Sequence, residues 1–127
     1  ENYNLMAKAG IHPADAPLFI PPYEWYNEEI AGWAQGMGLK IVNFTSGTGS
    51  NADYTTPDMK NDRSSKDIFN QIIKVEEADG LNGHLLLVHL GTHPDRTDKF
   101  YNRLDKLIKT LKKRGYTFVP LRDATGY

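Results

Sequence analysis

The sequence predicts an α/β fold in which about four parallel strands alternate with helices. Short apolar stretches alternate with longer segments of helical spacing, and glycine or proline separates most of them. Strands that are joined through helices in this way pair in parallel by right-handed crossovers. Four strands are too few to close a barrel of about eight, so the sheet is either open and doubly wound or part of a larger (β/α) barrel.

The first expected strand is short and follows a helix. Residues 2–9 favour a helix that Gly10 ends. Residues 18–20 form an extended apolar stretch, which stops at Pro21 because proline donates no ladder hydrogen bond. The chain begins without a methionine and enters the first helix directly, so we interpret its start as a cut in a longer protein.

A second helix, a second strand and a long loop follow. Asn27 is placed to cap a helix whose first turn holds two glutamates, and this helix is expected to run to about Gly36. Residues 39–44 have the composition of a buried strand. Residues 45–62 are polar and have no helical period, and a loop of this length is usually functional.

The second half of the chain repeats the order of helix and strand twice. Ser64 and Asp67 resemble a capping box at the start of a helix. Residues 84–90 form an apolar strand, and apolar residues at helical spacing from Phe100 onward predict another helix. Residues 116–121 are expected to form the last strand.

Size, charge and composition fit a single domain over residues 1–127. Of the 127 residues, 39% are hydrophobic, which suits one core and leaves no room for a second domain. The net charge of −1 comes from fifteen basic and sixteen acidic side chains spread along the chain, so we expect no nucleic-acid partner. No apolar run approaches the roughly 20 residues that span a membrane. No cysteine is present to form a disulfide or a thiolate metal site.

Two groups of conspicuous side chains are expected to be structural. Trp33 lies at helical spacing from the apolar residues of its helix, which is more typical of a core residue than of a sugar-stacking one. Asp95, Arg96, Asp98 and Lys99 are expected to be solvated and to cap the start of the last helix.

Three loops that follow predicted strands carry chemically active side chains. They are residues 21–27, residues 53–54 and residues 89–93. In parallel α/β folds such loops lie at the active face. Side chains alternate along a strand, so Leu87 and His89 project to the same side. A histidine at a strand end suits general acid or base catalysis, and a hydrogen-bonded structural histidine is the alternative.

Four segments form an ordered set of motifs: Phe19–Tyr23, Asp53 with Tyr54, Leu85–His89 and Arg114–Leu121. This set resembles the last three motifs and the closing strand of the polysaccharide deacetylases, which are the carbohydrate esterases of family 4. The resemblance covers nearly the whole chain and implies the C-terminal half of a distorted (β/α) barrel. It also implies a hydrolase that removes acetyl groups from N- or O-acetylated polysaccharide.

The resemblance implies a role for each residue around the histidine. His89 would protonate the leaving amine or alcohol, and Leu87 would line the pocket for the acetyl methyl group. Asp53 would orient His89 and favour its imidazolium form, because a nearby carboxylate stabilises positive charge. Tyr54 stands where the family often has tryptophan.

The proline-proline-tyrosine segment is expected to contact the substrate. Pro22 belongs to this substrate-binding loop, and Tyr23 would offer its backbone N–H to the oxyanion of the reaction. Trp25 is the better candidate to stack on a sugar ring. Ile20 replaces the arginine with which the family tethers its catalytic base, which suggests a divergent subgroup or an altered substrate.

The family binds a divalent metal, commonly zinc, through one aspartate and two histidines of an H-x-x-x-H motif. All three ligands precede the proline-proline-tyrosine motif, so we expect them upstream of Glu1 and expect this chain alone to bind no metal and to be inactive. His89 and His93 have the formal ligand spacing. They occupy the place of the family's acid histidine, and loop histidines are usually solvated, so we expect no metal there.

The resemblance also implies partners and a location. The expected partner is an acetylated polysaccharide or oligosaccharide, in the periplasm or outside the cell. A partial barrel leaves sheet edges and apolar surface uncovered. We therefore expect the chain to pair with the missing N-terminal half of its domain or with a second copy of itself.

Two other functions are open on the sequence. Residues 45–50 form a Thr/Ser/Gly-rich segment after a strand, where backbone N–H groups could hold a phosphate, as in a flavodoxin-like FMN-binding domain. No lysine follows these glycines, and the next expected helix begins about a dozen residues later. The other alternative is a non-catalytic carbohydrate-binding or assembly module of the deacetylase fold.

Overall fold

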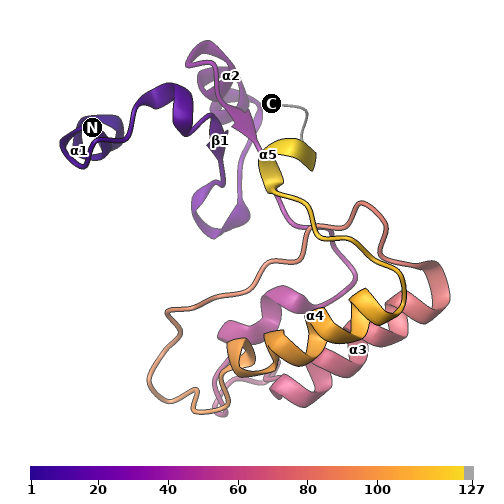
Figure 1. Cartoon of the computed structure of the whole chain (residues 1–127). Coiled ribbons are helices and arrows are strands. Elements are labelled where there is room, and N and C mark those ends of the chain that lie inside the picture. The colour runs from indigo at the N-terminus through magenta and orange to yellow at the C-terminus, as the bar shows by residue number, and fades with distance from the viewer. Residues whose placement is uncertain (125–127) are drawn as a thin grey trace. The chain divides into compact units, whose positions relative to one another are not determined.

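The computed structural model describes residues 1–124, and the chain divides into two compact units, Glu1–Asn43 and Phe44 onward. Figure 1 labels the main elements. The first unit contains α1 (Asn2–Lys8), the 3₁₀ helix η1 (Pro13–Asp15), β1 (Leu18–Phe19), the turn η2 (Pro22–Glu24), α2 (Glu28–Gly36) and β2 (Lys40–Ile41). The second unit contains the 3₁₀ helix η3 (Ser50–Tyr54), α3 (Ser65–Asp79), the 3₁₀ helix η4 (Phe100–Arg103), α4 (Leu104–Lys113) and α5 (Leu121–Ala124).

The first unit contains one parallel strand pair. β1 and β2 pair with Leu18 opposite Lys40 and Phe19 opposite Ile41, and α2 is the connection between them. This pairing is what the order of strand, helix and strand predicts for these two segments. The larger prediction, part of a (β/α) barrel, needs more strands than these two and stays a prediction.

Helix α2 begins and ends where its local sequence predicts. The side-chain oxygen of Asn27 accepts the N–H of Ile30 at 2.9 Å, and two glutamates occupy the first turn. Its inner side is formed by Ala34, which is buried, and by Ala31. Trp33 lies on the other side and is 61% exposed, so the expectation of a core tryptophan is wrong.

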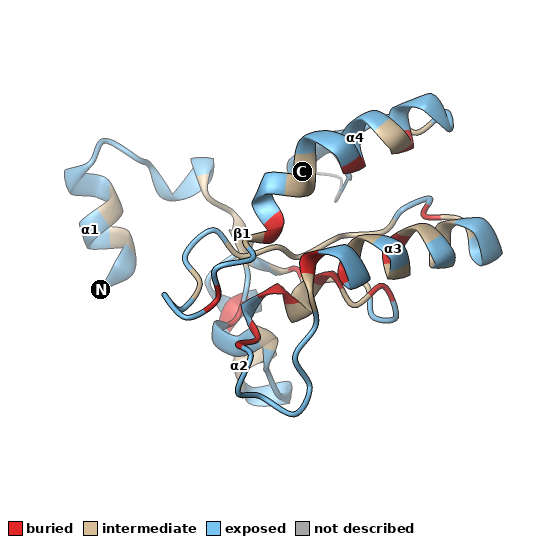
Figure 2. Cartoon of the chain, turned by 90° about the horizontal axis from the view of Figure 1, so that it is seen from below, coloured by how far each residue is buried: buried red, intermediate tan, exposed pale blue. Residues whose placement is uncertain are grey.

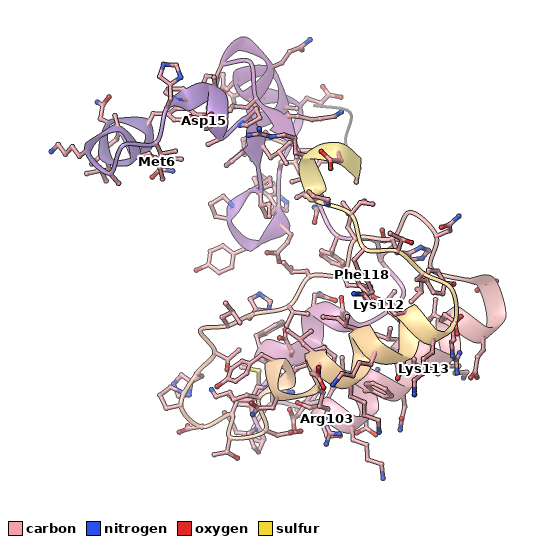
Figure 3. All side chains as sticks on the ribbon, viewed as in Figure 1. Met6, Asp15, Arg103, Lys112, Lys113 and Phe118 are labelled. Carbon is pink, nitrogen blue, oxygen red and sulfur yellow. The ribbon has the colours of Figure 1, made fainter. Side chains whose placement is uncertain are left out.

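The second unit has a core between α3 and α4. Figure 1 shows the two helices side by side, and Figure 2 shows buried residues along both of them. In Figure 3, Arg103 immediately precedes α4 and Lys113 is its last residue. Six apolar side chains, each at most 6% exposed, make this core: Ile68, Ile72, Leu81, Phe100, Leu107 and Leu111.

The start of α3 is capped twice. The hydroxyl of Ser64 accepts the N–H of Asp67 at 3.1 Å, which confirms the predicted cap. The carboxylate of Asp98 accepts the N–H of Ser65 at 2.5 Å, and the Ser65 hydroxyl donates to the Asp98 carbonyl at 2.8 Å. Asp98 therefore caps α3 and not the last helix, which corrects the expectation from sequence.

Two predicted strands are not regular strands in the part of the chain that the structure describes. Residues 84–90 and 116–120 run between helices, and α5 begins at Leu121. Leu85 has one backbone contact of the strand kind, because its carbonyl accepts the N–H of Thr45 at 2.9 Å. Tyr116 holds its segment by accepting the N–H of Leu81 at its hydroxyl, at 2.9 Å. A ladder requires a facing strand, which the apolar pattern of one segment does not supply.

Candidate active site

The polar loop after residue 44 packs against α3 and contains several buried side chains. Sequence polarity predicts a solvated connection, but five polar side chains of this loop are at most 4% exposed: Thr48, Ser50, Asp53, Thr55 and Thr56. Buried polar groups are stable only when they are hydrogen-bonded, so each of them constrains its surroundings. The exception among the side chains of this loop that the structure describes is the Ser50 hydroxyl, which is buried without a partner.

Asp53 binds His89 at two atoms. One carboxylate oxygen lies 2.7 Å from Nδ1 of His89, and the other accepts the backbone N–H of His89 at 2.8 Å. The Asp53 side chain is fully buried, whereas the His89 side chain is 31% exposed. Asp53 lies on η3, and His89 follows the segment that passes beside Thr45. The structure thus brings together the aspartate and histidine that the resemblance pairs, and their catalytic role stays a prediction.

The contact with Asp53 fixes the orientation of the imidazole. A carboxylate at Nδ1 stabilises the form in which Nδ1 carries a proton, and it leaves Nε2 to exchange a proton with another molecule. The ring of Tyr54 packs edge-on against the His89 ring, with the centroids 5.9 Å apart and the planes at 74°. Tyr54 is 46% exposed. The imidazole therefore has one buried, charged side and one aromatic neighbour near solvent.

Leu87 lies two residues before His89 and is half-buried. Its neighbours Leu86 and Val88 pack against the core of the second unit. The shared face that the sequence predicts for Leu87 and His89 rests on strand alternation. Residues 84–90 form no regular strand, so the shared face stays a prediction.

The proline-proline-tyrosine loop belongs to the first unit. Tyr23 and Glu24 both have φ near +57°, in the left-handed region that residues other than glycine rarely adopt. Asn43 stabilises this turn by donating from Nδ2 to the Glu24 carbonyl at 2.8 Å. Tyr23 is 94% exposed and Trp25 is 64% exposed, while Pro21 is buried. The loop thus displays two aromatic rings on a turn with an unusual backbone, and its neighbour Pro22 is exposed too.

Two residues that the sequence analysis took as solvated hold the loop after His89. Arg96 is only 3% exposed, and its guanidinium lies among carbonyl and hydroxyl oxygens. Lys99 donates from Nζ to the Thr92 hydroxyl at 2.7 Å and to the His93 carbonyl at 2.9 Å. Several of these acceptors are main-chain carbonyls, which every residue has, so no local sequence signal marks the two cations as the residues that hold this loop.

The described residues do not by themselves fit a zinc site. Within residues 1–124, no three histidine, aspartate or glutamate side chains are close enough together to hold a metal ion. Asp53 occupies Nδ1 of His89, and His93 is exposed with its Nδ1 3.5 Å from Asp95. The expectation that the ligands lie upstream of Glu1 stays a prediction.

The start of α3 is a poor phosphate site. Phosphates bind helix N-termini through free N–H groups and a positive dipole. Here the carboxylate of Asp98 already accepts the N–H of Ser65, so a phosphate would meet a negative charge. In the glycine-rich segment itself, Thr48 and Ser50 are fully buried. These contacts argue against a bound phosphate at the start of α3.

No protein-family model, curated protein or solved structure matches this chain. The resemblance to polysaccharide deacetylases therefore rests on the ordered motifs. Across residues 1–124, each helix is too short or too polar to cross a bilayer.

Proposed function

We propose that this chain supplies the acid histidine of a carbohydrate deacetylase, a hydrolase that removes acetyl groups from N- or O-acetylated polysaccharide. The observation that carries the proposal is the double contact of the buried Asp53 carboxylate with His89. A buried carboxylate that is committed to one half-exposed histidine is costly unless the pairing is maintained. The same arrangement of a carboxylate behind an imidazole orients catalytic histidines in acyl transfer.

In this proposal His89 acts as general acid after a water molecule has added to the acetyl carbon. The protonated imidazole donates the Nε2 proton to the leaving amine nitrogen or alcohol oxygen as the bond from that atom to the acetyl carbon breaks, which releases acetate. His89 is then neutral and keeps its Nδ1 proton, while Asp53 stays a carboxylate. The contact of Asp53 with Nδ1 and its contact with the His89 backbone N–H hold the Nε2 edge of the ring in one direction.

The resemblance assigns roles to the other site residues in this proposal. Leu87 would contact the acetyl methyl group, because it is apolar and is predicted to share the face of His89. Tyr54 would restrict the position of the imidazole through its edge-on contact. Tyr23 would donate its backbone N–H to the oxyanion, with Pro22 fixing the backbone before it, and Trp25 would stack on a sugar ring. The exposed rings of the tyrosine loop support a contact with sugar.

The proposal includes a divalent metal whose ligands precede Glu1, and zinc is the metal that the resemblance implies. When bound, the metal would supply Lewis-acid activation of the acetyl group.

The test is acetate release from an acetylated chito-oligosaccharide with added zinc. We expect turnover by a longer protein that includes the upstream ligands and none by residues 1–127 alone. Efficient turnover by residues 1–127 would refute the proposal that the metal ligands lie upstream of Glu1. A longer protein that releases no acetate from sugar amides or esters would refute the proposed deacetylase function.

A non-catalytic carbohydrate-binding module is the second candidate, and the exposed Tyr23 and Trp25 favour it. Such a module would bind chito-oligosaccharide without metal. Isothermal titration in the presence of a chelator distinguishes the two, because a module keeps its affinity. Trp25→Ala should then abolish binding, and Trp33→Ala is the matched control, since Trp33 is a similarly exposed tryptophan of the same unit.

A further inference from the structure

Arg96 makes directed contacts with three separate residues of the second unit. Its Nη1 donates to the Thr55 carbonyl at 2.6 Å and to the Thr55 hydroxyl at 3.1 Å. Its Nη2 donates to the Arg63 carbonyl at 2.9 Å and to the Ser65 hydroxyl at 3.4 Å. The nearest carboxylate oxygen, on Asp62, is 3.5 Å from Nη1. The guanidinium therefore bridges the loop before α3, the start of α3 and its own loop.

Thr55 closes the turn that carries Asp53. Its backbone N–H donates to the Ala52 carbonyl at 3.2 Å, which ends η3 immediately after Asp53 and Tyr54. The Thr55 hydroxyl accepts the N–H of Arg63 at 3.2 Å. Fixing Thr55 therefore fixes the last turn of η3 and the direction of the Asp53 side chain.

The other end of the bridge is the loop that follows His89. Arg96 comes seven residues after His89, and its N–H donates to the His93 carbonyl at 3.1 Å. Lys99 holds the same loop through the Thr92 hydroxyl and the His93 carbonyl. The segment of Asp53 and the segment of His89 are thus joined at two places, by the carboxylate–imidazole contact and by the Arg96–Thr55 contact.

Burial of the Arg96 guanidinium is not explained by packing alone. Burial of a charge costs free energy unless it is hydrogen-bonded, and an apolar side chain of similar volume is often as stable or more so. One donor of Arg96 makes no hydrogen bond, because its Nε is buried without a partner among the described residues. What a planar fork provides, and an apolar side chain does not, is the direction of several bonds at once.

We infer that Arg96 is a positioning residue for the Asp53–His89 pair: by fixing Thr55 it holds the Asp53 carboxylate against Nδ1 and the backbone N–H of His89. The inference deepens the site on which the proposed function rests. It concerns the hydrogen bonds of the pair, and these can be measured whether or not the chain acts on a sugar.

The experiment is nitrogen-15 NMR of the histidine rings in the 127-residue chain at a pH where His89 is neutral. In the wild type we expect the tautomer with the proton on Nδ1 to dominate. Arg96→Lys keeps the charge but replaces the planar fork with a single ammonium, so it should raise the fraction with the proton on Nε2 severalfold. Asp53→Ala, which removes the group at Nδ1, marks the uncoupled ring. Lys99→Met is the matched control, because it loosens the loop at His93 without touching Thr55.

A folded Arg96→Lys chain with the wild-type tautomer and an unchanged His89 amide shift would overturn the inference. An equal change in Lys99→Met would also overturn it, because general loosening of the loop would then be sufficient. If Arg96→Lys does not fold, Thr55→Val takes its place, since it removes one acceptor of Nη1 and keeps the guanidinium. A smaller tautomer change in the same direction is expected, and none would count against the inference. If the protein turns out not to be a deacetylase, the tautomer and amide-shift measurements still test whether Arg96 positions the pair.

Discussion

Asp53 and His89 are 36 positions apart, and both oxygens of the aspartate bind the histidine, one at Nδ1 and one at the backbone N–H. A single contact to the ring would allow the imidazole to pivot about the hydrogen bond. The second contact holds the main chain of His89 at the same carboxylate, so ring and backbone are fixed together. The carboxylate therefore links the polar loop to both the ring and the main chain of His89.

The first prediction concerns the general acid. In an active, longer protein, His89→Ala should lower the rate of acetate release by about 10²–10⁴, which is roughly 3–5 kcal/mol in activation free energy. The physical reason is that the leaving group would then depart without a proton. Steady-state assays with an acetylated chito-oligosaccharide measure the effect. His84→Ala is the control, because His84 precedes the same segment, and it should leave the rate within about twofold. A His89→Ala protein with wild-type rate would remove His89 from the role.

The second prediction concerns the start of α3. Asp98→Ala removes the acceptor of the Ser65 N–H, and loss of a helix cap costs about 0.5–2 kcal/mol of the free energy of unfolding. Urea unfolding followed by circular dichroism measures this. Asp95→Ala is the matched control in the same loop, because the Asp95 side chain is 74% exposed and such changes usually stay within about 0.5 kcal/mol. Equal stability of the two variants would show that Asp98 does not cap α3.

The helix starts could be predicted because their signals are local. Asn27 and Ser64 each accept an N–H three residues later, so a short stretch of sequence contains both partners. Whether residues 84–90 and 116–121 form strands could not be predicted in the same way, because a strand ladder depends on a facing segment that is distant in the sequence. The burial of Arg96 was also invisible, since two of its acceptors are the main-chain carbonyls of Thr55 and Arg63.

The contact of Asp53 with His89 was predicted from the order of motifs and not from local physical signals. Neither residue predicts the other by spacing, and only the order of motifs shared with the polysaccharide deacetylases pairs them. The same motifs place Tyr23 in the site, and that placement stays a prediction. Fold elements thus followed from local physical signals, whereas the candidate site followed from the resemblance.

The third prediction is a pH effect at Asp58. The Thr56 hydroxyl donates to the Asp58 carboxylate, and this hydrogen bond holds the pKa of Asp58 below the ordinary aspartate value. A carboxyl with a lowered pKa in the folded state adds stability above its unfolded pKa. That contribution is lost as the pH falls below about 4, through the folded pKa. Carboxyl carbon-13 titration by NMR should give a lowered midpoint.

Thr56→Val should raise the Asp58 midpoint toward the ordinary aspartate value, because the largest of the contacts that lower this pKa is gone. Thr110→Val is the control, since the Thr110 hydroxyl donates to the Lys106 carbonyl within α4. It should leave the Asp58 titration unchanged. An Asp58 midpoint that is ordinary in the wild type, or that ignores Thr56→Val, would contradict the contact.

The fourth prediction concerns association of the chain with a second copy of itself. Phe118 and Val119 follow α4, in a segment outside the regular elements, and they are 49% and 57% exposed (Figure 3). Leu90, next to His89, is 77% exposed. Exposed apolar side chains beside unpaired backbone favour association. We therefore expect the isolated chain to form dimers as its concentration rises, and sedimentation equilibrium measures this.

The double variant Phe118→Ser, Val119→Lys should weaken the association of the isolated chain by at least about tenfold, because it removes exposed apolar area and adds a charge. Leu5→Lys is the control, since Leu5 is 58% exposed on α1 and far from this segment in sequence. It should leave the association constant unchanged. A chain that stays monomeric at all concentrations would show that these side chains need no partner. Equal weakening by Leu5→Lys would show that association does not depend on the segment after α4.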